Sequence, residues 1–186
     1  RSLVGSEMCI RDSIHIQYYI LNDDQTGCRL RDALVAKARE GVRVRILYDD
    51  VGSSGAKKSF FRSMRSEGIE VYAFLHVKFP LFTSKVNYRN HRKIVVIDGR
   101  IGFIGGMNIA DRYVRGTQWG TWRDTHFRIE GSGAAGLQAS FLSDWSATTK
   151  RHIAGAEYYP AAKRHTDDIL QIVPSGPFGK WRTLLQ

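Results

Sequence analysis

The spacing of hydrophobic residues along the first half of the chain changes repeatedly between two positions and about 3.6 positions. Alternation such as that of Val42, Val44 and Ile46 places side chains on one face of a strand. Helical spacing precedes Gly41 and Gly68, and glycine commonly ends helices. These patterns predict strands at 14–20, 42–48 and 69–74 and helices at 29–40 and 57–67.

The second half of the chain has a similar pattern around one strong turn signal. Asp98-Gly99 separates two short apolar stretches, and this dipeptide is typical of two-residue hairpin turns. We therefore predict strands at 92–97, 101–104 and 122–129, a helical turn at 108–114 and a helix at 137–145. Strands that alternate with helices predict an α/β fold with a mixed, largely parallel β-sheet flanked by helices.

The composition fits a globular domain with a strongly basic surface. The 186 residues carry a formal net charge of +10, and 42% of them are hydrophobic. This charge predicts an anionic partner, either nucleic acid or an anionic lipid surface, although an ordinary solvated basic surface would give the same total. The two cysteines argue against a disulfide framework or a cysteine-based metal site. The sequence contains no apolar run near the length of about 20 residues that spans a bilayer.

Eighteen residues that begin at His91 follow the pattern H-x-K-x4-D-x6-G-G-x-N at every fixed position. His91 and Lys93 are two positions apart, so they share one face of the predicted strand. If residues 98–99 form the hairpin loop, Lys93 faces Ile104 and His91 faces Gly106. A glycine opposite the histidine would leave space for a ligand.

The residue types in this motif suit an attack on a phosphodiester. A neutral imidazole at His91 can attack phosphorus and form a covalent intermediate. Lys93 and Asn108 can bind the non-bridging oxygens, whose charge must be stabilised through the transition state. The other ring nitrogen needs an acceptor that fixes the tautomer. A histidine alone is more often structural and a lysine alone more often solvated, but the complete pattern favours a catalytic motif.

Basic and apolar residues lie close to the motif in the sequence. Lys85, Arg89 and Arg92 would place positive charge where a phosphate binds, so Arg89 and Arg92 are candidate substrate-binding residues. The segment 77–86 puts three large apolar residues in a predicted loop before the motif. An apolar loop beside a basic phosphate site suits a lipid with acyl chains, although these side chains could equally cover the core.

The motif and several stretches outside it resemble the phospholipase D superfamily, whose members carry the HKD motif, and more specifically the bacterial cardiolipin synthases. The stretches are SIHIQYYILNDDQTG, GVRVRILYDDVGS, NYRNHRK, WRDTHFRIEG and LQASFLSDW, and the resemblance extends over residues 13–186. It implies a phospholipase D-like domain and a reaction that uses neither a metal nor a cofactor.

The same resemblance implies roles for individual residues. His91 would be either the nucleophile or the general acid, and Lys93 and Asn108 would bind the phosphate. Asp124, in the strand after the motif, would orient the histidine. The motif positions expected to be structural are Asp98, Gly105 and Gly106.

The activity implied by the resemblance is phosphatidyl transfer. Cardiolipin synthases join two phosphatidylglycerol molecules through a phosphatidyl-histidine, so the expected partners are anionic phospholipid and the surface of the bacterial cytoplasmic membrane. Active sites in this family combine two motifs, and this chain contains one, so a second HKD half would be needed in cis or in trans. Two alternatives stay open: a single-motif homodimeric phosphodiesterase or endonuclease that acts on nucleic acid, and a non-catalytic fragment that binds anionic lipid or phosphate.

The domain organisation expected from the resemblance is that of an incomplete protein. Residues 1–12 lack a periodic pattern and are interpreted as a non-native leader, with an ordinary disordered or interdomain lead-in as the alternative. Residues 13–149 would form the catalytic half with its one HKD motif, and 150–168 a linker. Residues 169–186 resemble the truncated start of a second phospholipase D-like half.

Overall fold

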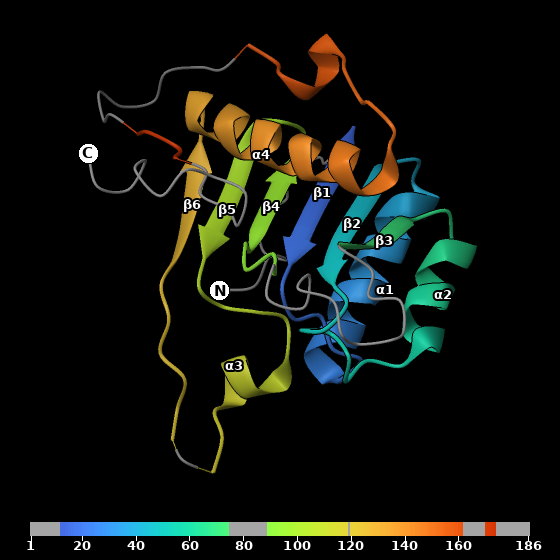
Figure 1. Cartoon of the computed structure of the whole chain (residues 1–186), viewed down its shortest axis with the longest axis vertical. Coiled ribbons are helices and arrows are strands. Elements are labelled where there is room, and N and C mark those ends of the chain that lie inside the picture. Colours follow the sequence, from blue (N-terminus) through green and yellow to red (C-terminus); the bar gives the residue numbers. More distant parts are fainter. Residues whose placement is uncertain (1–11, 75–88, 119, 162–169, 174–186) are drawn as a thin grey trace.

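A six-stranded β-sheet forms the centre of the protein (Figure 1). The computed structural model describes residues 12–74, 89–118, 120–161 and 170–173. The strands are β1 (Ser13–Tyr18), β2 (Arg43–Asp49), β3 (Glu70–Phe74), β4 (Ile94–Ile97), β5 (Ile101–Gly105) and β6 (His126–Glu130). The helices are α1 (Gln25–Arg39), α2 (Lys58–Ser66), α3 (Asp111–Arg115) and α4 (Ser132–Thr149), followed by a 3-10 turn, η2 (Ala156–Tyr158). The strand order is β3-β2-β1-β4-β5-β6.

The two halves of the sheet differ in strand direction. β1, β2 and β3 are parallel because α1 and α2 carry the chain back between them. β4, β5 and β6 are each antiparallel to the preceding neighbour in the sheet. The predicted α/β fold with a mixed sheet is confirmed. However, three of the five described pairings are antiparallel, contrary to the expected predominance of parallel strands. A tight turn and the connection 106–125 return the chain without a crossover on the sheet.

Helices cover both faces of this sheet, as Figure 1 shows. α1 and α2 lie over the face that carries Ile46 and Val95. α4 crosses the opposite face, where Trp145 packs with Leu47 and where Leu137 packs with neighbouring strand residues. All six residues of β1 are buried, as expected for a central strand covered on both sides.

The hairpin turn forms at the predicted dipeptide. Asp98 and Gly99 have positive φ values of 52° and 62°. The Arg100 N–H donates to the Ile97 carbonyl at 3.0 Å, as in a two-residue type I′ turn. The Arg100 carbonyl, however, accepts from the Gly131 N–H at 3.2 Å instead of continuing the β4–β5 ladder. Arg100 is therefore an additional residue in the loop.

This additional residue shifts the strand register by one position. Ile104 faces Ile94 rather than Lys93. The predicted pairing of Lys93 is therefore wrong, and the pairing of His91 with Gly106, which rested on the same count, is wrong with it.

The boundaries of the last two elements also differ from the prediction. β6 starts at His126 rather than at position 122, so Asp124 lies in the connection before the strand. α4 starts at Ser132 rather than at 137, through a glycine-containing stretch that disfavours helix. Two glycines in the first turns of α4 allow close packing against residues 170–173. A Cβ at Gly133 would lie 2.5 Å from the Leu170 side chain, and a Cβ at Gly136 would lie 2.7 Å from that of Ile172. Among the described helices, none is long and apolar enough to cross a bilayer.

Candidate active site

The motif lies at the sheet edge where the carboxyl ends of β1 and β2 meet the start of β4. Gln17, near the end of β1, pairs with Ile94, the first residue of β4. Residues 89–93 therefore stand just beyond the edge where the arrowheads of β1 and β2 lie in Figure 1. Open α/β sheets commonly bind ligands at the carboxyl ends of their parallel strands. His91 is exposed at this edge, whereas Lys93 is only 3% exposed.

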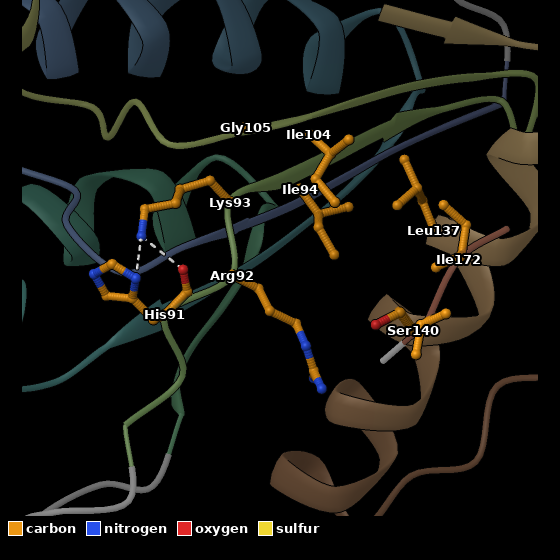
Figure 2. Close-up of a pocket in the computed structure, with 10 residues that line it drawn as sticks. His91, Arg92, Lys93, Ile94, Ile104, Gly105, Leu137, Ser140 and Ile172 are labelled. Atoms are coloured by element: carbon orange, nitrogen blue, oxygen red, sulfur yellow. Dashed lines mark hydrogen bonds between the residues drawn. The ribbon is translucent and has the colours of Figure 1, made fainter. Parts of the chain in front are cut away.

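His91 and Lys93 contact each other directly (Figure 2). The Lys93 Nζ donates to the His91 carbonyl oxygen at 2.6 Å and lies 2.9 Å from Nδ1 of the imidazole. Tyr19, just after β1, borders both groups: its ring centroid lies 4.8 Å from that of His91 and 5.6 Å from the Lys93 Nζ. The structure thus places the imidazole and the ammonium together, as their spacing of two residues predicts.

The surroundings of this pair lower both of its pKa values. Partial burial, and then repulsion from Lys93, holds the pKa of His91 below its usual 6.5, while Asp49 acts in the opposite direction. Burial lowers the pKa of Lys93 from 10.5 to about 8, and the carboxylate of Asp124 opposes that shift. At pH 7 the pair therefore combines a neutral imidazole with a cationic ammonium. This is the protonation state that attack on an anionic phosphodiester requires.

Asn108 lies at the same sheet edge and is 4% exposed. Its Oδ1 accepts from the Ile20 N–H at 3.0 Å, and its Nδ2 donates to the Tyr113 hydroxyl at 2.8 Å. These bonds fix the amide against the end of β1. Within the described part of the chain, no hydrogen bond joins it to His91 or Lys93.

Asp124 approaches the pair from the connection before β6. Its Oδ2 accepts from the indole N–H of Trp122 at 3.3 Å, and its charge acts on Lys93. Its hydrogen bonds to described residues include none from His91. The predicted orientation of His91 by Asp124 therefore stays a prediction.

The two motif glycines make room for this connection. A Cβ at Gly106 would lie 2.0 Å from the Asp124 carboxylate, and one at Gly105 would lie 2.3 Å from the Thr125 carbonyl oxygen. Glycine at position 106 therefore allows the close approach of Asp124, rather than leaving space opposite the histidine.

Carboxylates hold the two arginines that were predicted to bind substrate. Arg92 extends toward α4, away from the side chains of the motif histidine and lysine (Figure 2), and forms an ion pair with Asp144. Arg89 Nη1 lies 3.8 Å from Oδ1 of the fully buried Asp49. Asp49 also accepts from the N–H of Gly52 at 2.9 Å, so its carboxylate caps the loop that follows β2. A phosphate at either arginine would have to compete with a carboxylate.

A pocket of about 260 Å³ lies between the motif and α4 (Figure 2). Ile94, Ile104, Leu137 and Ile172 give it an apolar wall. The pocket lies on the side toward which Arg92 points. An apolar hollow therefore adjoins the motif, and His91, Arg92 and Lys93 are among the residues that line it.

Several predicted features fall outside the described residues. They include the apolar segment 77–86 with Lys85, most of the leader at 1–11, and the stretches 162–169 and 174–186. Lipid contact by the segment, and the division into leader, linker and second half, stay predictions.

Asp98 supports the hairpin at the end of β4 that is remote from His91. Its Oδ1 accepts from the N–H groups of Asp12 and Ser13 at 3.0 and 2.9 Å. Its own N–H donates to the Ser13 carbonyl at 2.9 Å. Asp98 therefore ties the turn to the start of β1.

We expect Asp98→Ala to lower the free energy of unfolding by about 1–3 kcal/mol, because two N–H groups lose their acceptor. Alanine would also have to adopt a positive φ, which asparagine tolerates. Asp98→Asn, which keeps one acceptor oxygen, should therefore lose less stability than Asp98→Ala. Urea denaturation of both variants measures the difference, and equal losses would contradict this account.

Comparison with known proteins identifies close sequence relatives. A family model described as "Cardiolipin synthase, PLD-like domain" matches residues 9–145. Cardiolipin synthase 2 of Bacillus cereus is 42% identical over 99% of this chain, and the cardiolipin synthase of Listeria innocua is 44% identical over 94% of it. The chain spans 36% and 37% of the lengths of these two relatives, about a third of each.

Solved structures share the fold at low sequence identity. NucT from Helicobacter pylori superposes with a TM-score of 0.55 at 17% identity, over 74% of this chain and 81% of its own. A phosphatidylserine synthase from Haemophilus influenzae also gives 0.55 at 16% identity, over 72% of this chain and 31% of its own. These likenesses establish the fold alone, whereas the family model covers most of the chain and confirms the resemblance predicted from the sequence. The chain belongs to the cardiolipin synthase family with a phospholipase D-like domain.

Proposed function

We propose that the chain is one catalytic half of a phosphatidyltransferase that makes cardiolipin from two phosphatidylglycerol molecules. The main observation behind this proposal is the contact between His91 and Lys93 at an exposed sheet edge, in a chain that is 42–44% identical to cardiolipin synthases. Phosphatidyl transfer needs a neutral nucleophile beside a cation, and this pair supplies both.

In the first step, Nε2 of the His91 ring attacks the phosphorus of one phosphatidylglycerol. An N–P bond forms, the P–O bond to the headgroup breaks, and glycerol leaves after it takes up a proton. In the second step, a headgroup hydroxyl of another phosphatidylglycerol loses its proton and attacks the same phosphorus. The N–P bond breaks, and cardiolipin is released. A histidine of the second half would move the proton; if that histidine is the nucleophile, His91 moves the proton instead.

Three side chains would assist this reaction. The ammonium of Lys93 now lies at Nδ1 of His91, and a bound phosphate would attract it away from the ring. Nδ1 could then donate to a carboxylate, and Asp124, whose charge already acts on Lys93, is the candidate acceptor. One N–H of the Asn108 amide donates to Tyr113, and the other could meet a phosphate oxygen.

The proposed partners are an anionic phospholipid, the bacterial cytoplasmic membrane surface and a second HKD half, with no cofactor. The net charge of +10 supports attraction to anionic lipid, and the apolar pocket beside Arg92 supports contact with hydrocarbon. Arg89 and Arg92 would bind lipid phosphate only after exchange with their carboxylate partners. The second half would come from the remainder of a longer protein or from another chain.

We expect transfer to depend on pH as a bell-shaped curve. The imidazole of His91 must be neutral to attack, so activity should fall as the pH drops through the lowered pKa of His91, below 6.5. The ammonium of Lys93 must be charged, so activity should also fall as the pH rises through about 8. Measurement of kcat/KM from about pH 5 to 10 tests both limbs. A flat profile across this range would exclude these two groups as the titrating pair.

Vesicles of phosphatidylglycerol separate the proposed function from its alternatives. The chain alone and the complete protein would be incubated with vesicles, and with DNA in parallel. Cardiolipin and glycerol in equal amounts would support the synthase, whereas phosphatidic acid and glycerol would indicate a hydrolase. DNA cleavage without lipid turnover would favour the single-motif nuclease. Vesicle binding without either reaction would leave a non-catalytic lipid-binding protein.

A further inference from the structure

We infer that Asp144 of α4 is a positioning residue for His91, because its carboxylate holds the residues on both sides of that histidine. Oδ2 of Asp144 accepts from Nδ2 of Asn90 at 2.9 Å, and the same oxygen forms the ion pair with Arg92. One carboxylate therefore fixes positions 90 and 92, and with them the backbone of His91. The expected effect of Asp144 on the rate of transfer rests on the proposed function, whereas its expected effect on the backbone at residues 90–92 does not.

The backbone around His91 lacks the support that a strand would give. Residues 89–93 belong to no helix or strand, and β4 starts only at Ile94. Strand residues are held by ladder hydrogen bonds, so here side chains must take over that function. Asn90 is 7% exposed, and its Oδ1 accepts from the Arg92 N–H at 3.1 Å. The side-chain bonds of Asn90 and Arg92 thus meet at Asp144.

Residues of two strands also bond to Asn90 and Asp144. Gln17 of β1 donates to Oδ2 of Asp144 at 2.6 Å, and the Asn90 N–H lies 3.4 Å from Oδ2 of Asp49 at the end of β2. The side chains of Asp144 and Asp49 are 14% and 0% exposed. Charge-assisted hydrogen bonds in such sheltered positions constrain geometry more than exposed ion pairs do. α4, β1 and β2 therefore fix one short segment together.

The position of His91 matters because its ring nitrogen must approach phosphorus in line with the bond that breaks. A displacement of about 1 Å can slow such a reaction by about 100-fold. Asp144 has no hydrogen bond to the ring of His91 or to Lys93 among the described contacts. It would therefore act through Asn90 and Arg92.

Asp144→Asn tests this inference, because the amide keeps the shape but cannot accept from three donors at a single charged oxygen. Leu142→Ala is the matched control for stability: Leu142 lies on the same helix, is 5% exposed and packs with Trp145 in a separate cluster. Asp32→Asn is the control for charge, since it removes an exposed carboxylate paired with Arg31.

Three measurements compare these variants with the wild type: the melting temperature, amide hydrogen exchange at residues 90–93 in this chain, and kinetics in the complete protein. For Asp144→Asn we expect exchange at 90–93 to become about tenfold faster. We also expect kcat to fall about 10- to 100-fold with KM changed less than about threefold. Leu142→Ala should lower the melting temperature but leave exchange at 90–93 and kcat close to wild type. Asp32→Asn should match the wild type throughout.

A variant Asp144→Asn that only lowers the melting temperature, as Leu142→Ala does, would overturn the inference. Unchanged exchange at 90–93 would overturn it too, whatever the kinetics show. Faster exchange in a protein whose wild type has no transferase activity would uphold the positioning of the segment and reject the proposed function instead.

Discussion

Replacement of His91 by alanine is expected to lower phosphatidyl transfer by about four orders of magnitude or more, because the reaction then loses a group that attacks phosphorus or moves the proton. The fold should tolerate the change. The imidazole is exposed, and its described partners are Lys93 and Tyr19. The free energy of unfolding should therefore change by less than about 1 kcal/mol. Cardiolipin formation by the complete protein and urea denaturation of the chain measure the two quantities separately.

His152→Ala is the matched control for this variant. His152 is exposed and lies after α4, outside the motif and its described contacts. It should keep wild-type activity and stability. If His91→Ala retained more than about a tenth of the wild-type rate, His91 would be excluded from the chemical step.

Local patterns in the sequence predicted most of the fold, because each pattern extends over a single element. The three parallel strands and their two helices follow from hydrophobic spacing, and the Asp98-Gly99 turn follows from its dipeptide. The register of the hairpin did not follow. It depends on the Arg100 carbonyl, which bonds to Gly131 beyond β6. The position of that partner is a property of the assembled sheet and has no local signal.

The candidate site, too, could be predicted from local sequence only in part. The motif predicted that His91 and Lys93 lie together, and they do, although the segment that carries them is not a strand. It did not predict that Arg92 turns to Asp144, which is 52 positions away on α4. A basic residue beside a phosphate motif suggests substrate binding unless a distant carboxylate is known to meet it. The sequence also did not predict the burial of Lys93. That burial depends on how the end of β1 and the connection 106–125 pack around the lysine in the folded chain.

Replacement of Lys93 by methionine is expected to lower transfer by about 1,000-fold and to stabilise the folded chain at the same time. The loss of rate follows from the loss of the cation that would stabilise charge on the phosphate oxygens. The gain in stability follows from the burial of the ammonium, which is 3% exposed and whose pKa falls from 10.5 to about 8 on folding. A shift of this size corresponds to about 3 kcal/mol of destabilisation at neutral pH.

The sign of this effect can be checked through its dependence on pH. Between about pH 8 and 10.5 the folded chain binds fewer protons at Lys93 than the unfolded chain does. The free energy of unfolding of the wild type should therefore rise with pH in that range, relative to the variant. The penalty is fully present below about pH 8 and disappears above 10.5. Methionine also loses the bonds from Nζ to His91, so we expect a net gain of about 1–2 kcal/mol at pH 7.

Lys58→Met provides the comparison, since Lys58 is exposed at the start of α2 and remote from the motif. It should change neither the rate nor the dependence of stability on pH. Urea denaturation at about pH 7 and pH 10 for the wild type and both variants gives the required differences. A Lys93→Met chain that is less stable than the wild type at pH 7 would mean that the bonds to His91 outweigh the cost of burying the charge. The main contribution of Lys93 to stability would then be its bonds to His91, and the lowered pKa of Lys93 would not account for the stability of the variant.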